Sequence, residues 1–233
     1  MAFRPPIVDS ADRAFTDRRE AGRELAGKLQ HYAGRPDVVV LALPRGGVPV
    51  AFEVAEALNA PLDIFIVRKL GMPGHPEFAI GAIAPGGVRV LSEDVIRRYG
   101  IPQSMIDTVA REALAELQRL EREYRDSRPL IELRDRIAIL VDDGLATGSS
   151  MRAAVGAVRM HKPARVVVAV PVGARSSCAE FGAIADETIC ARTPEPFSAV
   201  GQWYRDFSQT TDEEVRALLQ RHAAHARTTE RQR

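Results

Sequence analysis

Short apolar runs alternate with amphipathic segments through most of the chain. Runs rich in β-branched residues predict strands buried on both faces at 38–43, 61–70, 137–141 and 165–171, with a last strand at 187–191. Helical spacing of apolar residues follows them at 48–58, after 148 and at 176–184. This alternation predicts an α/β fold whose mainly parallel sheet is covered by helices on both faces.

The stretch between the second and third of these runs departs from the alternation. Two glycines and two prolines fall within 71–78, which predicts a loop of the kind that often covers an active site as a mobile lid. Apolar runs at 79–84 and 88–91 predict a hairpin around Pro85-Gly86-Gly87. A short helix from Ser92 and a long charged helix over 103–124 follow, and the long helix is a candidate homodimer interface.

The chain ends in a segment of different texture. We expect one domain over 1–233, with a core of about 35–192 and a C-terminal segment of about 193–226 that holds the only Trp, in a chain that is 6% aromatic. An aromatic face with polar neighbours can stack a flat ring, whereas such clusters more often cover the edge of a core. Both interpretations stay open for Phe197, Trp203 and Tyr204.

Composition narrows the setting. Apolar content is 45%, charged content is 27% and net charge is +1, so nothing calls for nucleic acid or an anionic membrane. The start lacks an apolar signal region, and no apolar run approaches the roughly 20 residues of a spanning helix. Cys178 and Cys190 form no C-x-x-C pair, which indicates neither a disulfide framework nor a zinc site. We therefore expect a cytoplasmic protein with reduced cysteines.

The densest chemistry follows the strand at 137–141. Asp142 and Asp143 end this strand at the edge where open α/β sheets bind ligands. Vicinal carboxylates accept hydrogen bonds from the vicinal hydroxyls of a ribose, and through water they can also face a cation. The loop that follows opens a helix, whose free N–H groups and hydroxyls predict an anion pocket. A simple N-cap at Thr147 or Ser149 is the competing explanation.

The order of strand, acid pair, A-T-G-S-S and helix resembles the phosphoribosyl pyrophosphate (PRPP) motif of type I phosphoribosyltransferases. The resemblance implies their fold and the transfer of a 5-phosphoribosyl group from PRPP to a nitrogen acceptor such as a nucleobase, with release of pyrophosphate. It gives Asp142 and Asp143 the ribose hydroxyls. It gives the 5′-phosphate to the loop residues Gly144, Leu145, Ala146, Thr147, Gly148, Ser149 and Ser150.

A second glycine turn follows the strand at 38–43. Arg45, Gly46 and Gly47 open the next helix, and they form either a tight turn or a second anion site. The resemblance favours the pyrophosphate of PRPP here and implies a strained or cis peptide bond next to Arg45. Arg68 and Lys69 end the run at 61–70, and we expect both to neutralise the same leaving group.

The remaining candidates concern the proton, the acceptor and the metal. His75 and Glu77 are the side chains of the predicted lid that could transfer a proton, although both are equally explained as exposed loop residues. Glu77 and Lys69 are the catalytic candidates of this region. The resemblance makes Phe197, Trp203 and Tyr204 the acceptor hood. Mg²⁺ is expected to arrive with PRPP, because no protein cage of oxygen ligands is evident and only Asp142 and Asp143 are placed to meet it through water.

Some features leave alternatives open. Enzymes for 6-oxopurines in this family usually carry an acid at the position of Ala146, so the acceptor is undetermined, and the chain as a whole is most similar to uncharacterised bacterial members. A PRPP- or nucleotide-sensing regulator on the same fold would need a basic surface or a further DNA-binding element. A dinucleotide-dependent oxidoreductase would need G-x-G-x-x-G, and a phosphatase would leave the T-G-S-S loop unexplained.

Overall fold

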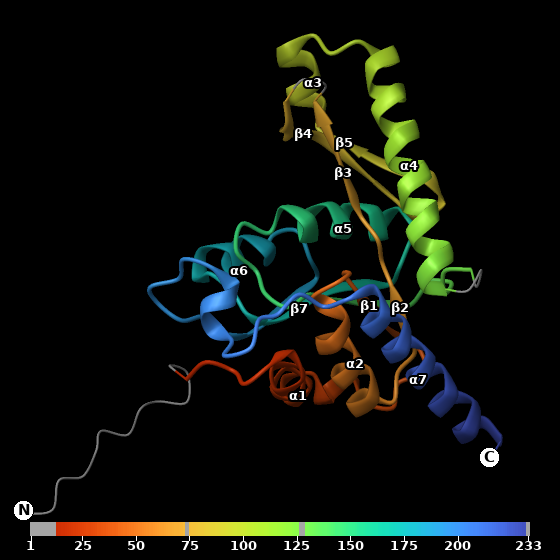
Figure 1. Ribbon diagram of the computed structural model, residues 1–233, viewed down its shortest axis with the longest axis vertical. Helices are drawn as coiled ribbons and strands as arrows, with labels where there is room; N and C mark the ends of the chain where they lie inside the picture. The colour runs from red at the N-terminus through yellow and green to blue at the C-terminus, as the bar shows by residue number, and fades with distance from the viewer. Residues whose placement is uncertain (1–12, 73–74, 126–128, 232–233) are drawn as a thin grey trace, which may run out of the picture.

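A parallel five-stranded sheet forms the centre of the protein. The computed structural model describes residues 13–72, 75–125 and 129–231, and its sheet has the strand order β2-β1-β6-β7-β8 (Figure 1). The strands are β1 (Val38–Ala42), β2 (Leu62–Ile64), β6 (Ile137–Val141), β7 (Arg165–Val172) and β8 (Glu187–Arg192). The helices around them are α1 (Arg18–Lys28), α2 (Gly47–Leu58), α5 (Ser149–Met160), α6 (Arg175–Phe181) and α7 (Asp212–Arg231), with short 3-10 turns η2 (Gln30–Tyr32) and η4 (Val200–Trp203).

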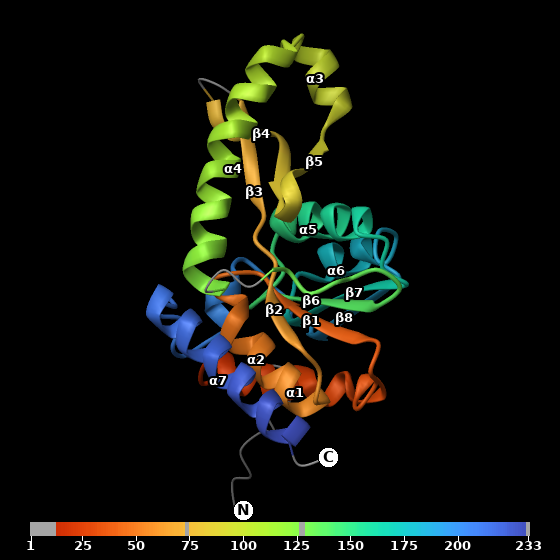
Figure 2. The same ribbon diagram turned by 90° about the vertical axis from the view of Figure 1, so that its right-hand side faces the viewer.

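Burial on both faces explains the continuous apolar runs. Strands β1 and β6 pair in register from Val38 opposite Ile137 to Ala42 opposite Val141, and every side chain in both strands is buried. Helices α1, α2 and α7 cover one face of the sheet, while α5 and α6 cover the other (Figures 1 and 2). Because successive residues of a strand face opposite sides, alternate residues of β1 belong to two separate apolar clusters. The predicted α/β fold is confirmed.

A second lobe stands beyond α5 and carries the insertion (Figure 2). It contains an antiparallel sheet of β3 (Arg68–Met72), β4 (His75–Ala84) and β5 (Val88–Leu91), with the 3-10 turn η3 (Pro85–Gly87) between the last two. Helices α3 (Glu93–Tyr99) and α4 (Gln103–Arg125) complete the lobe. The predicted hairpin and both helices are confirmed.

Two predictions for the start of this lobe are wrong. The run 61–70 is not one strand, since β2 ends at Ile64 and β3 begins at Arg68 in the other sheet. Hydrophobicity does not mark the point where a chain leaves one sheet for another. The predicted loop at 71–78 is largely a hairpin of β3 and β4, with residues 73–74 outside the described part. Shifts of register around Gly71 accommodate its glycine as a bulge rather than a break.

A buried ion pair ties the lobe to the central sheet. Arg125, at the end of α4, donates from Nε to Asp63 Oδ1 at 2.8 Å and from Nη2 to the Ile64 carbonyl at 2.5 Å. The other oxygen of Asp63 accepts the Ile131 N–H at 3.1 Å. Both charged side chains are buried, so removing either partner would leave an unpaired buried charge and destabilise the fold. The pair holds the end of α4 against β2 of the central sheet.

The cysteines form a disulfide, contrary to the prediction of reduced thiols. Cys178 on α6 and Cys190 on β8 are bonded, with their Cα atoms 6.5 Å apart. Their spacing of 12 residues carries no motif, because the contact arises only when α6 returns the chain to the sheet beside β7. The disulfide fastens α6, and α6 contacts the loop that follows β6.

Candidate active site

The acid pair lies where predicted, at the carboxyl end of β6. Asp142 and Asp143 follow the last residue of the strand, and Asp142 Oδ1 accepts the Asp143 N–H at 2.9 Å. Helix α5 begins at Ser149, so its first-turn N–H groups have no partner within the helix. Within the described residues, the exposed hydroxyls of Thr147, Ser149 and Ser150 have no protein partner. Carboxylates and free donors therefore meet at one edge of the sheet.

The two carboxyl groups are held under electrostatic stress. Burial raises the pKa of Asp142 well above its usual range, and the neighbouring charge of Asp143 raises it further. Burial also raises the pKa of Asp143, while the Arg18 guanidinium counteracts that shift. A site that keeps two carboxylates together needs donors or cations to stabilise them, which is the situation a ligand hydroxyl relieves.

Parts of the predicted phosphate loop serve packing instead. The Leu145 N–H donates to the Val172 carbonyl at 2.9 Å and its side chain is buried, so this residue is unavailable to an anion. A Cβ on Gly144 would lie 2.4 Å from Val200 Cγ1, and one on Gly148 would lie 2.4 Å from Phe181 Cε2. At both glycines the space that a Cβ would need is filled by a neighbouring side chain. Gly148 also has φ of +70°.

The turn between β1 and α2 lies directly against the acid pair. A cis peptide bond joins Pro44 and Arg45, which confirms the unusual bond expected next to Arg45. A Cβ on Gly46 would come within 2.1 Å of Asp143 Oδ2, and one on Gly47 within 2.7 Å of the Val141 carbonyl oxygen. The Gly47 N–H donates to the Leu43 carbonyl within the turn. The glycines thus allow close approach of two loops, and the Gly47 amide is not free for an anion.

One cavity of about 380 Å³ joins these elements. Its lining includes Arg45, Arg68, Asp142 and Ser150, which come from the β1–α2 turn, β3, the end of β6 and the start of α5. Lys69 does not line it, because consecutive residues of a strand point to opposite faces. The structure therefore brings one cation of the Arg68-Lys69 pair to the site and turns the other away.

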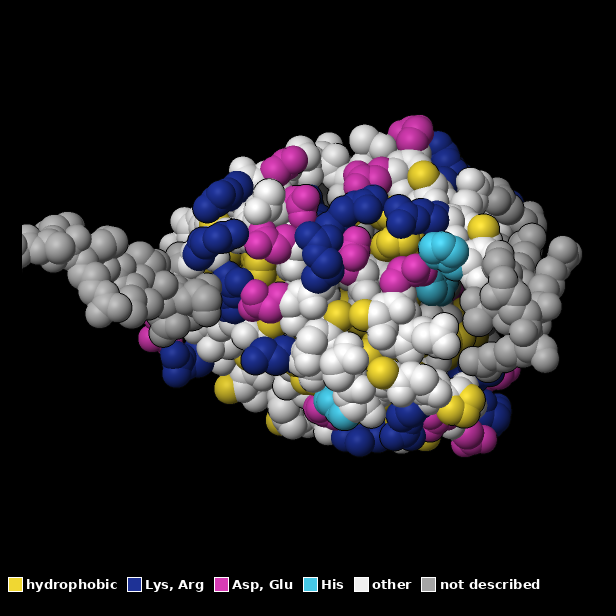
Figure 3. Space-filling model, turned by 90° about the horizontal axis from the view of Figure 1, so that it is seen from below, with side chains coloured by type: hydrophobic (Ala, Val, Ile, Leu, Met, Phe, Trp, Pro, Cys, Tyr) yellow, Lys and Arg dark blue, Asp and Glu magenta, His cyan; other side chains and the backbone are white. Residues whose placement is uncertain are grey.

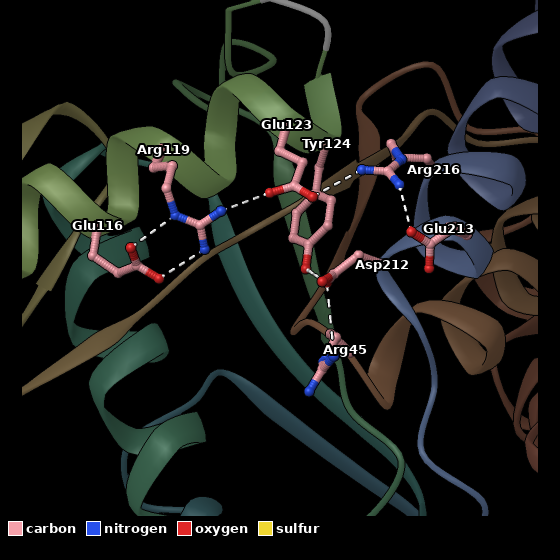
Figure 4. A network of polar contacts seen from close by, with 8 residues as sticks. All are labelled: Arg45, Glu116, Arg119, Glu123, Tyr124, Asp212, Glu213 and Arg216. Atoms are coloured by element: carbon pink, nitrogen blue, oxygen red, sulfur yellow. Dashed lines mark hydrogen bonds and ion pairs between the residues drawn. The ribbon is translucent and has the colours of Figure 1, made fainter.

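Helices α4 and α7 supply a wall that the sequence did not indicate. Glu116, Arg119 and Tyr124 of α4 and Asp212 of α7 line the cavity (Figure 4). The Tyr124 hydroxyl donates to Asp212 Oδ1, and Arg45 Nη1 lies 3.8 Å from the same oxygen. The hydrogen bond from the Arg119 guanidinium lowers the pKa of the Glu116 carboxyl group. Long-range contacts of this kind leave no local pattern in the chain.

The ionic contacts of this wall continue along both helices. Arg119 holds Glu116 with two hydrogen bonds of 2.9 and 3.0 Å, and it holds Glu123 at 2.8 Å (Figure 4). Arg216 of α7 donates to the other oxygen of Glu123 at 2.8 Å. The chain of contacts links α4 of the lobe to α7.

The predicted hood lies away from the cavity. Phe197 and Trp203 pack with Phe15 and the buried Tyr204 in a small apolar cluster, and none of them lines the cavity. The Tyr204 hydroxyl donates to the Asp143 carbonyl at 2.5 Å, and burial raises the pKa of this phenol. In this arrangement the aromatic segment contacts the acid pair through the hydrogen bond from Tyr204 to Asp143.

Arg18 is a functional candidate that the sequence analysis did not single out. Its Nε donates to Asp143 Oδ2 at 2.9 Å, and its side chain is only 11% exposed. A cation near the N-terminus of a helix opposes the helix dipole, and that position is the one local signal of a special role. The side chains of His75 and Glu77 lie outside the described residues.

The outer face agrees with the near-zero net charge. Seen from below, basic and acidic side chains lie side by side over the surface formed by α1, α2 and α7, without an extended patch of one sign (Figure 3). Among the described residues, no group of three or more His, Cys, Asp or Glu side chains has an arrangement that could hold a metal. No described helix combines the length and apolar character needed to cross a membrane.

Comparison with known proteins identifies the family. The sequence model of the phosphoribosyl transferase domain matches residues 14–190. Two proteins from strains of Mycobacterium tuberculosis, provisionally named phosphoribosyl transferases, are 52% identical over 207 residues, which is 89% of this chain and 46% of each relative. The chain thus spans about half the length of these curated relatives. The crystal structure of TT1426 from Thermus thermophilus is 45% identical with a TM-score of 0.79, over 88% of this chain and 97% of that one. The domain match covers most of the sequence, and the chain belongs to the phosphoribosyl transferase family.

Proposed function

We propose that this protein transfers a 5-phosphoribosyl group from PRPP to a nitrogen acceptor and releases pyrophosphate. The observation that carries the proposal is one cavity lined by Asp142, the start of α5 and three arginines, among them Arg45 and Arg68. A ribose diol, a terminal phosphate and a diphosphate each need a different chemical partner. Carboxylate, helix N-terminus and guanidinium provide these three partners at one site.

In this proposal the ribose lies on the acid pair. Asp142 uses one oxygen to accept the Asp143 N–H, which leaves its other oxygen for a ribose hydroxyl. The 5′-phosphate then lies at the start of α5, on the N–H groups and hydroxyls from Thr147 to Ser150. The second hydroxyl falls to Asp143 only if its carboxylate is free, and in this structure that carboxylate binds Arg18.

The diphosphate belongs on the arginine side of the cavity. Arg45 and Arg68 are placed to neutralise it, and Lys69 would contribute only through its charge, from the opposite face of β3. In this proposal Mg²⁺ binds together with the diphosphate, because the described residues offer no cluster of direct metal ligands, and Asp142 would contact the ion through water. When bound, the ion supplies charge neutralisation for the departing diphosphate.

The chemical step breaks the bond between C1 of the ribose and the diphosphate oxygen, and it forms a bond from C1 to the acceptor nitrogen. Positive charge develops on the ribose ring while negative charge develops on the leaving group. The protein assists by positioning both parts, stabilising the anion with arginines and excluding water. Glu77 remains our candidate for removing the acceptor proton.

The acceptor we propose is a nucleobase-like ring. Its place would be the side of the cavity bounded by α4, unless closure of the chain ends brings Phe197 or Trp203 toward it. Ring stacking on the aromatic segment requires such a rearrangement, because Tyr204 is buried in the present one. The proposal for PRPP does not depend on this choice.

Calorimetric titration with PRPP and Mg²⁺ tests the proposal, followed by a screen of bases for pyrophosphate release. We expect binding that Asp142→Asn and Arg45→Gln both weaken, whereas Arg97→Gln, on the exposed surface of α3, has no effect. Binding without release for any acceptor would support the sensor alternative instead. No binding of PRPP by the wild-type protein would refute the proposal.

A further inference from the structure

The two members of the acid pair face different surroundings. Asp142 lines the cavity and Asp143 does not. The Asp143 carboxylate points to Arg18, and the two side chains are 16% and 11% exposed. On the other side the same oxygen faces Gly46, where a Cβ would lie only 2.1 Å away. Asp143 is therefore enclosed between α1 and the β1–α2 turn.

The far end of the chain fixes Arg18 in turn. Its Nη1 donates to the Ser208 carbonyl at 2.7 Å, and its guanidinium carbon lies 4.1 Å from the centre of the Phe207 ring. A guanidinium that donates in two directions and stacks on a ring has little freedom to turn. Arg18 thus presents its Nε to Asp143 in one defined direction.

The main chain of Asp143 is held by the same segments. The Tyr204 hydroxyl donates to its carbonyl, and the Tyr204 ring lies 5.5 Å from that of Phe15. Backbone hydrogen bonds join Phe15 to Trp203 and Arg205 at 2.8 and 2.7 Å. The Asp143 N–H then donates to Asp142, which completes a continuous set of contacts from the chain ends to the cavity.

We infer that Arg18 is a positioning residue for ligand binding: it occupies the Asp143 carboxylate, fixes the turn after β6 and leaves Asp142 as the carboxylate that meets the ribose. The inference rests on the proposed function, since it assigns the ligand of Asp142. It also gives the aromatic segment a role, which is to seat the Arg18–Asp143 pair.

A purely structural ion pair is the alternative. In that case Arg18 would contribute to the stability of the fold, and its loss would leave the affinity of the folded protein unchanged. The geometry favours the positioning role. Among the described contacts, the hydrogen bond from the Asp143 N–H to Asp142 is the only polar contact that joins Asp143 to a residue of the cavity. Movement of Asp143 would carry that link with it.

Arg18→Gln, Arg18→Lys and Arg19→Gln separate the two accounts. Arg19 is the matched control, since it is the next residue, is 40% exposed and lies 3.8 Å from Glu53. PRPP affinity is measured by calorimetry with Mg²⁺ on protein whose melting temperature and near-ultraviolet circular dichroism show a folded state. Arg18→Lys keeps the charge, and it serves as the test if the glutamine variant fails to fold.

We expect Arg18→Gln to weaken PRPP binding by roughly tenfold, the effect of one charge-assisted hydrogen bond. Arg18→Lys should recover part of this loss, and Arg19→Gln should bind like the wild type. In an Asp143→Asn background, Arg18→Gln should add less than about a twofold change, because the two residues act as a unit.

Wild-type affinity in folded Arg18→Gln, or an undiminished effect in the Asp143→Asn background, would overturn the inference and leave the proposed function standing. The same holds if Arg18→Lys alone is folded and binds no differently from Arg19→Gln. A wild-type protein that does not bind PRPP would overturn both.

Discussion

Alanine at Gly148 tests the structural reason for the glycine in the loop after β6. Gly148 has φ of +70°, and a Cβ there would lie 2.4 Å from the Phe181 ring. Gly34 is a matched control, because its φ is +69° and nothing lies within 4 Å of the equivalent position. We expect Gly34→Ala to lower the free energy of unfolding by about 1–2 kcal/mol through the left-handed backbone alone.

Gly148→Ala should cost more, because overpacking against Phe181 adds about 1–3 kcal/mol to the same backbone cost. The expected total is therefore about 2–5 kcal/mol. Urea unfolding of both variants measures the difference, provided that the slope with denaturant stays constant. A Phe181→Leu change should reduce the cost of alanine at 148 and leave that at Gly34 unaltered. Equal losses for the two alanine variants would refute the steric explanation.

Two further predictions concern the acid pair and the disulfide. Burial and Asp143 raise the pKa of Asp142, so ionising it costs stability, and this cost shrinks as pH falls below the raised pKa and is gone below the pKa of the unfolded chain. Asp142→Asn should accordingly melt higher than wild type at pH 7, by a margin that shrinks on acidification, and a lower melting temperature at pH 7 would contradict the charge argument. Replacing Cys178 and Cys190 by serine should lower the free energy of unfolding by about 3 kcal/mol for a separation of 12 residues, as should reduction of the wild type, and urea curves that coincide with the oxidised protein would count against it.

Local patterns predicted the central part of the site well. The buried strand β6, the acid pair and the helix after Gly148 are adjacent in the chain, and each has its own signature in apolar runs, carboxylates or glycine. The resemblance added the unusual peptide bond next to Arg45, which no periodicity indicates. Local sequence was thus sufficient to predict those parts of the site that neighbouring residues form.

Contacts between distant segments were beyond this kind of reasoning. Arg18 and Asp143 lie 125 residues apart, so nothing near either position announces their ion pair. Tyr124 and Asp212 meet because the lobe and α7 pack together, and the Cys178–Cys190 bond depends on how α6 returns to the sheet. The glycines at 46 and 148 were recognised as special, but the atoms they accommodate belong to Asp143 and Phe181.

The electrostatics of the acid pair connect stability with ligand binding. Two partly buried carboxylates side by side destabilise the free protein, and Arg18 counteracts the raised pKa of both but donates a hydrogen bond only to Asp143, which does not line the cavity. Asp142 lines the cavity, where a ribose hydroxyl or a hydrated cation can approach its carboxyl group. Natural proteins tolerate such local costs at functional sites because the rest of the fold offsets them. A ligand that donates to Asp142 would therefore bind a carboxylate that the protein has kept without a full set of partners, and it would stabilise the folded state as it binds.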